Sequence, residues 1–263
     1  MSQTNLLEMP LATAEPTPQQ PRHDTPLAWG PHPSAEEKLV VSAAAPPRMV
    51  EQYRKLAATL YYAQAERGVK ILMITSAVPG EGKSLTTANL ALTLSESYQR
   101  RVLLIDADLR RPSLHMIFQI PNMSGLGEAL KPGATGALNP VKLTANLSMV
   151  PVGERSADPM AGLTSQRMRE LIHDESERYD WVIIDTPPVG LLSDAKLLAQ
   201  MVDGALFVVG AGETQYALVQ HALDALGREK VLGIVLNRAD DRHSGGRYGY
   251  YKYYDAYTSA AKG

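Results

Sequence analysis

The chain contains no cysteine among its 263 residues. Disulfide bonds, thiolate metal sites and iron–sulfur clusters all depend on cysteine sulfur. The sequence therefore excludes a disulfide-stabilised fold and a metal-cluster reductase.

Long apolar runs and an excess of positive charge are also missing. No apolar stretch reaches the roughly 18 residues of a membrane-spanning helix, and the first residues lack the basic start and apolar core of a signal peptide. The formal net charge is −2, which gives no reason to expect nucleic acid as a partner. We expect a cytoplasmic protein.

The composition fits one α/β domain with a tail at each end. At 44% apolar residues, the chain is long enough to bury a full core. Nine of the 18 prolines lie in residues 1–47, which show no sustained apolar period. We predict a disordered leader over 1–47, a folded domain over 48–239 and a flexible tyrosine-rich tail over 240–263.

A phosphate-binding loop is the first chemical signal. The apolar run 71–75 is followed at once by the glycine-rich segment 76–84, and a helix is expected from Lys83 onward. Backbone N–H groups of such a loop bind phosphates, its lysine reaches the β and γ phosphates, and the hydroxyl of Ser84 ligates Mg²⁺. Ala77 replaces the first glycine of the general pattern. We predict an ATP site formed by Pro79, Gly80, Glu81, Gly82, Lys83, Ser84 and Leu85.

Carboxylates follow two further apolar runs. Asp106 and Asp108 come after residues 102–105, and Asp185 comes after residues 181–184. Side chains at the carboxyl ends of parallel strands converge on the ligand crevice. A single aspartate in such a position is often only a turn residue. The set of three beside Lys83 predicts Mg²⁺ binding and activation of a nucleophile.

Three other residues near the expected strand ends allow two interpretations each. Arg110 and Arg111 can balance phosphate charge or can be solvated turn residues. Asn237, after the last expected strand, can contact the adenine or can simply turn the chain. We predict the adenine contact for Asn237.

The tail carries six tyrosines within ten residues. An ATP site and a cluster of phosphorylatable hydroxyls on one chain suggest a protein that phosphorylates itself. Four of the tyrosines share the spacing of one helical face, so a packed aromatic stripe is the alternative to a mobile substrate segment. The predicted phosphorylation sites are Tyr248, Tyr250, Tyr251, Tyr253, Tyr254 and Tyr257.

The phosphate loop, the segments 106–110 and 184–188 and the tail together resemble the bacterial tyrosine kinases of capsule and exopolysaccharide export. The resemblance extends from about residue 51 to residue 257. It implies ATP and Mg²⁺ as cofactors, autophosphorylation in trans and regulation of polysaccharide export. The residues it matches to catalysis are Lys83, Asp106 and Asp108, and those it matches to the metal are Ser84, Asp106 and Asp185.

The same resemblance implies partners. The chain is similar to the stand-alone form of the family, so a separate membrane-spanning chain-length regulator is expected to activate it at the inner face of the membrane. A cognate tyrosine phosphatase is expected to reset the tail. The family's oligomerisation element, E-x-x-R-x-x-R, is kept at Glu51 and Arg54, whereas Ala57 replaces its last arginine. A homo-oligomer is expected, although an exposed helix without an interface fits these residues equally well.

Strands that alternate with helices predict a P-loop-type fold, with a largely parallel sheet flanked by helices on both faces. Two alternatives belong to other functional classes. A positioning or partitioning ATPase of this superfamily would carry a lysine early in the loop, where Val78 stands here. A nucleotide-binding scaffold without kinase activity would have no need of the three aspartates.

Overall fold

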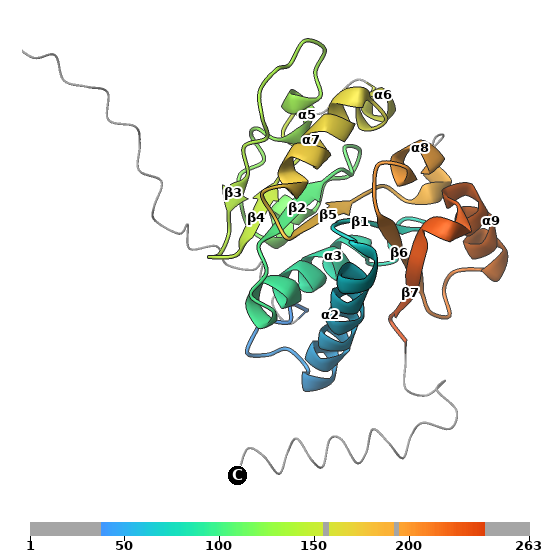
Figure 1. Cartoon of the computed structure of the whole chain (residues 1–263). Coiled ribbons are helices and arrows are strands. Elements are labelled where there is room, and N and C mark those ends of the chain that lie inside the picture. The colour runs from blue at the N-terminus through green and yellow to red at the C-terminus, as the bar shows by residue number, and fades with distance from the viewer. Residues whose placement is uncertain (1–37, 155–157, 192–194, 240–263) are drawn as a thin grey trace, which may run out of the picture.

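The structure is a computed structural model that describes residues 38–154, 158–191 and 195–239 (Figure 1). Most of the predicted leader and the whole tyrosine-rich segment lie outside these ranges.

The described chain forms a mostly parallel sheet of seven strands in the order β3-β4-β2-β5-β1-β6-β7 (Figure 1). Neighbouring strands run parallel except for β3, which pairs antiparallel with β4. This confirms the predicted sheet. The strands are β1 Ile71–Ser76, β2 Val102–Asp106, β3 Val141–Lys142, β4 Leu147–Val150, β5 Trp181–Asp185, β6 Gly204–Gly210 and β7 Val231–Asn237.

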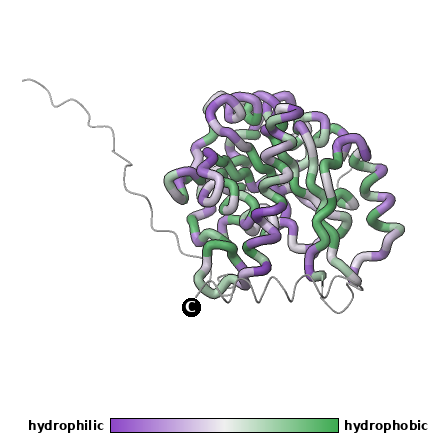
Figure 2. The backbone as a smooth tube through the Cα atoms, turned by 60° about the horizontal axis from the view of Figure 1, so that its bottom comes forward, coloured by the Kyte–Doolittle hydropathy of each residue, from purple (hydrophilic) through white to green (hydrophobic). Residues whose placement is uncertain are grey.

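Helices cover both faces of this sheet, as predicted. One apolar core lies under α2 and α3, and a second lies under α7, α8 and α9. Hydrophobic positions lie mostly in the interior of the fold, and hydrophilic positions mostly at its outside (Figure 2). The α-helices are α2 Pro47–Arg67, α3 Lys83–Leu92, α4 Leu114–Ile117, α5 Leu126–Ala129, α6 Pro159–Leu163, α7 Gln166–Ser176, α8 Ala195–Ala199 and α9 Tyr216–Leu226.

The remaining helical pieces are short. Helix α3 begins at Lys83, as predicted, and continues as a π-helical turn over Thr93–Ser97. Single 3₁₀ turns occur at Val189–Leu191 and Arg228–Lys230.

Local sequence explains where the main elements begin and end. Strands β2 and β5 are buried along their whole length, which fits their continuous apolar runs at the centre of a parallel sheet. Ser165 caps α7 by accepting a hydrogen bond from the Met168 N–H at 3.1 Å. Helix α2 ends at Gly68, whose φ of 69° is the left-handed conformation that glycine adopts without strain.

The packed chain reaches further towards the amino terminus than the predicted domain start at residue 48. Residues 38–45 form turns ahead of α2, and Leu39 is fully buried in the core under α2 and α3. Among the helices of the described residues, none has both the length and the apolar character that a membrane crossing requires.

The start of β1 depends on one carboxylate, which gives a test of the fold. Asp203 accepts hydrogen bonds from the backbone N–H groups of Lys70 and Ile71 at 2.7 and 2.8 Å. Asp203→Ala should lower the free energy of unfolding by about 1 kcal/mol, because both donors lose their protein acceptor. Urea unfolding measures the change. The control Asp224→Ala, which removes an exposed ion pair with Arg228, should leave the midpoint unchanged; equal shifts in the two variants would contradict the assignment.

Candidate functional site

The phosphate-binding loop lies between β1 and α3, and it depends on glycine. Gly80 and Gly82 have φ angles of 87° and 90°, which L-residues with a side chain rarely adopt. A Cβ atom on Gly82 would also lie only 2.0 Å from the Asn237 Nδ2 atom. Gly82 is therefore required both for backbone conformation and for the close approach of β7.

The Glu81 side chain anchors the loop from inside the protein. One carboxylate oxygen accepts the Val78 N–H at 2.8 Å, and the other accepts the Gly210 N–H at 3.0 Å and the Thr214 hydroxyl at 2.6 Å. Glu81 is only 2% exposed. Its carboxylate thus holds the loop against the end of β6, and only its backbone is left to contact a ligand.

The end of β7 forms a second anchor. The Asn237 side-chain amide donates to the Glu81 carbonyl at 2.9 Å, and the Arg238 guanidinium donates to the Gly80 carbonyl at 2.6 Å. Arg238 also pairs with Glu213. Since the Asn237 amide already binds the loop, its predicted contact with adenine stays a prediction.

A cavity of about 560 Å³ opens beside this loop. It is lined by most of the predicted ATP-site residues, Pro79, Gly80, Gly82, Lys83, Ser84 and Leu85, and by the predicted catalytic residue Asp108. Arg110 and Arg111 also line it, which favours their charge-balancing interpretation over a purely solvated turn. Sequence reasoning did not assign the other lining residues, which are Ser113, Pro187, Pro188 and Leu191.

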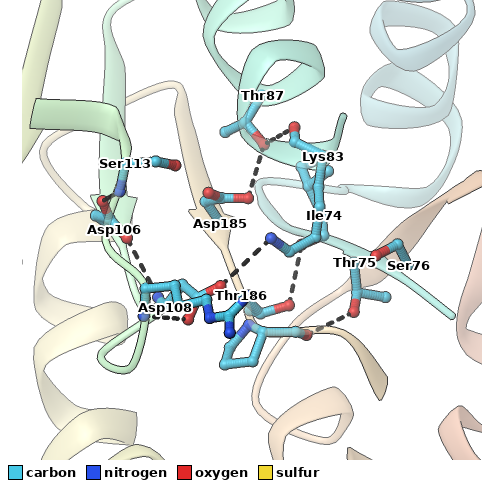
Figure 3. A network of polar contacts seen from close by, with 12 residues as sticks. Ile74, Thr75, Ser76, Lys83, Thr87, Asp106, Asp108, Ser113, Asp185 and Thr186 are labelled. Atoms are coloured by element: carbon cyan, nitrogen blue, oxygen red, sulfur yellow. Dashed lines mark hydrogen bonds and ion pairs between the residues drawn. The ribbon is translucent and has the colours of Figure 1, made fainter. Parts of the chain in front are cut away.

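The three predicted carboxylates come together at the carboxyl ends of β2 and β5 (Figure 3). Asp106 and Asp185 are paired in register on the two neighbouring strands, and both are fully buried. The Lys83 Nζ atom lies 3.4 Å from the nearer Asp108 carboxylate oxygen. Among the three, only Asp108 lines the cavity.

Asp106 serves mainly to hold the backbone that follows β2. Its carboxylate accepts N–H groups from Asp108 at 3.2 Å and from Ser113 and Leu114 at 3.1 Å each. Burial, together with the neighbouring charge of Asp185, raises the pKa of Asp106 to about 8 despite these hydrogen bonds. Its predicted metal-binding and catalytic roles stay predictions.

Asp185 is the carboxylate best placed for a metal. Burial raises the pKa of Asp185, while the Lys83 ammonium and a hydrogen bond from Ser84 oppose that rise. One of its oxygens accepts the Thr87 hydroxyl at 3.2 Å, and the other is buried without a hydrogen-bond partner in the described structure. An unpartnered anionic oxygen next to a serine hydroxyl fits Mg²⁺, which prefers oxygen ligands.

The donor set for a metal is small. In the described part of the chain, no three histidine or acidic side chains surround one point as a metal cluster would require. Mg²⁺ in nucleotide sites is commonly held by one or two protein ligands plus phosphate oxygens and water. Ser84 and Asp185 match that smaller arrangement.

Threonines hold the strand ends in register around the site. The Thr186 hydroxyl donates to the Ile74 carbonyl at 2.9 Å, and the Thr75 hydroxyl donates to the Pro187 carbonyl at 3.0 Å (Figure 3). These bonds join β1 to the end of β5. Hydroxyl residues at the last positions of apolar strands are the sequence signal for this contact.

Comparison with protein families places the fold among P-loop NTPases. Residues 68–243 match the ParA family, described as NUBPL iron-transfer P-loop NTPase. Such a domain binds nucleotide through its phosphate loop.

Individual relatives are more specific. The chain is 38% identical over 205 residues to tyrosine-protein kinase YwqD of Bacillus subtilis strain 168, a match that covers 76% of this chain and 85% of that protein. Among solved structures, the kinase domain of the Escherichia coli tyrosine kinase ETK has a TM-score of 0.65 at 32% identity, over 75% of this chain and 80% of that one. The chimerical protein CapA2B2 has a TM-score of 0.68 at 29% identity, over 78% and 91%.

The glycine geometry predicts a specific loss of binding. Gly82→Ala should weaken nucleotide binding by about tenfold or more, because the methyl group adds left-handed strain and displaces Asn237 from the loop. Titration with a fluorescent ATP analogue measures the affinity. Gly133→Ala is the matched control, since Gly133 has φ +79° with open space around it. An affinity equal to that of the control would show that the close approach at Gly82 is unimportant.

The pKa of Asp106 predicts how the metal-free protein responds to pH. Folding raises the pKa of Asp106 from 3.8 to about 8. The contribution of this carboxyl to the free energy of unfolding is therefore fully present below about pH 4 and is lost as the pH rises towards 8. Asp106→Asn mimics the protonated carboxyl. It should remove this decline, on the order of a few kcal/mol, in unfolding measured with EDTA from pH 4 to 8. Parallel pH curves for the two proteins would contradict the raised pKa.

Proposed function

The chain belongs to the bacterial tyrosine-protein kinases, and from that premise we propose that it transfers the γ-phosphoryl group of ATP to tyrosines of its own carboxyl-terminal segment. The observation that carries the proposal is the cavity that contains Lys83, Ser84 and Asp108, on a chain that ends in six clustered tyrosines. The target tyrosines lie within residues 248–257, outside the described structure.

Phosphoryl transfer depends mainly on positioning and on neutralisation of the phosphate charge. The loop anchored by Glu81 presents backbone N–H groups to the phosphates, and Lys83 follows at the start of α3. Arg110 and Arg111 add positive charge to the wall of the cavity. These groups supply the electrostatic part of catalysis.

Ser84 and Asp185 would hold Mg²⁺, as their hydroxyl and unpartnered carboxylate oxygen indicate. Bound Mg²⁺ supplies charge neutralisation at the phosphates. Lys83 lies close to Asp108 in the described state, so its ammonium must shift from that carboxylate towards the phosphates when nucleotide binds. That shift frees Asp108 for another role.

A tyrosine hydroxyl has a pKa near 10 and must lose its proton during transfer. In our proposal the bond from the tyrosine oxygen to the γ-phosphorus forms, the bond from that phosphorus to the β–γ bridging oxygen breaks, and ADP leaves. The proton passes to the Asp108 carboxylate, which is 5% exposed and lines the cavity. Asp106 positions Asp108 by accepting its backbone N–H.

The wider role is also a proposal. Regulation of polysaccharide polymerisation or export, a membrane-spanning activator and a tyrosine phosphatase are supported by the motifs shared with the family. On α2, Arg54 is exposed, Glu51 is half-buried and Ala57 is fully buried against the domain's own core. Only the first two positions of the oligomerisation element can therefore reach a neighbouring protomer.

Phosphate on the tail is the direct test. Mass spectrometry of residues 247–263 from native cells should find phosphotyrosine, and Lys83→Met should reduce it about a hundredfold or more, because the loop loses its charged contact to the phosphates. Lys142→Met, an exposed lysine on β3, is the matched control. A tail without phosphate while polysaccharide is being made would overturn the proposal in favour of an ATPase switch.

A mixing experiment separates transfer within one chain from transfer between chains. A Lys83→Met chain with its tail intact is mixed with an active chain whose six tail tyrosines are replaced by phenylalanine. Phosphate on the Lys83→Met tail shows transfer between chains. An unmodified tail in the mixture, beside a wild-type protein that is modified, shows transfer within one chain.

A further inference from the structure

The turns before α2 are bound to the helix that carries the phosphate loop. The Asn89 side chain of α3 accepts the Val40 N–H at 2.9 Å and donates to the Lys38 carbonyl at 2.8 Å. Asn89 itself is 1% exposed, and both hydrogen bonds are partly buried. We refer to residues 38–45 as the strap, and Figure 1 shows it in blue next to α2 and α3.

An apolar side chain fixes the strap at the same point. Leu39, between the two residues that Asn89 binds, is fully buried in the core under α2 and α3. Val41, two positions further along, is 46% exposed. The strap is therefore attached through buried Leu39, partly buried Val40 and two hydrogen bonds to the Asn89 amide.

Helix α3 joins this attachment to the site. Lys83 lies at its first position, and the Thr87 hydroxyl donates to Asp185. Asn89 follows two residues later, and Tyr53 of α2 lies against Asn89 and Thr86. Helix α3 thus carries residues of the proposed nucleotide site in its first two turns, and Asn89, which binds the strap, follows them in the same helix.

We propose that Asn89 is a positioning residue for the phosphate loop, and that the seated strap holds α3 in the orientation that binds Mg-ATP. This rests on the proposed nucleotide site. Binding of the strap to α3 raises the affinity of the site for nucleotide. By linkage, bound nucleotide favours the strap-bound state over the detached state by the same factor.

The rate of trypsin cleavage after Lys38 measures how readily the strap detaches from α3. The bond after Lys38 has its carbonyl bound by Asn89 and its next residue buried, so cleavage there requires the strap to open. Adding Mg²⁺ and a non-hydrolysable ATP analogue to the full chain should slow this cleavage. The factor should lie between about 5- and 150-fold, the usual range of coupling between two sites. Cleavage after Arg228, an exposed residue in a 3₁₀ turn far along the chain, is the internal reference.

Variants test the reverse direction. Leu39→Ala should lower the affinity for a fluorescent ATP analogue, and raise the KM for ATP, by the factor found with trypsin. Val41→Ala, an exposed residue of the same strap, should change neither. Asn89→Asp is the second variant, because it keeps the side-chain volume and an acceptor for Val40 but loses the donor to Lys38. It should give the same loss if Leu39→Ala does not fold.

The outcomes separate the two proposals. Unchanged cleavage at Lys38 in the presence of a bound analogue, or equal affinities in Leu39→Ala, Asn89→Asp and Val41→Ala, would overturn the role of the strap. Phosphotyrosine that depends on Lys83 would still support the kinase. A wild-type protein that binds no nucleotide would overturn both.

Discussion

Two buried carboxylates on adjacent strand ends are the constraint around which the site is arranged. Asp106 and Asp185 are paired in register, and neither is exposed to solvent. Like charges so close together in a poorly solvated place are costly unless protons, donors or cations compensate them. The structure supplies backbone N–H groups to Asp106, hydroxyls to Asp185 and the Lys83 ammonium close by. In the proposed site, Mg²⁺ bound with the nucleotide would complete this balance.

The central part of this arrangement could be predicted from sequence. Strands β1, β2 and β5 are continuous apolar runs that each end in a polar residue, and a parallel sheet necessarily brings such ends together. The positions of Lys83, Ser84 and Asp108 in one cavity follow from that rule. The two-residue strand β3 and the four-residue helix α4 are too short to show a period, so they were not expected.

Other features depend on contacts that no local pattern encodes. The Glu81 carboxylate binds Gly210, which lies 129 positions later in the chain. The Asn89 side chain binds Val40, which lies 49 positions earlier. From the residue type alone, each polar side chain would be expected to contact a ligand or solvent. In the structure, each instead forms hydrogen bonds to backbone groups of a distant segment. Leu39 shows the same limit, since an apolar run of only three residues at the end of a proline-rich segment gives no sign that it fills the core.

The hydrogen bond from Arg238 to Gly80 fixes where the last part of the chain starts. Ten positions separate Arg238 from Tyr248, a reach of at most about 35 Å. Tyrosines attached so close to their own phosphate loop would meet it at an effective concentration in roughly the millimolar range. In the proposed reaction, phosphorylation of the tail by its own phosphate loop would therefore depend on tether length more than on protein abundance. Inserting residues after 239 would tune it without altering any catalytic group.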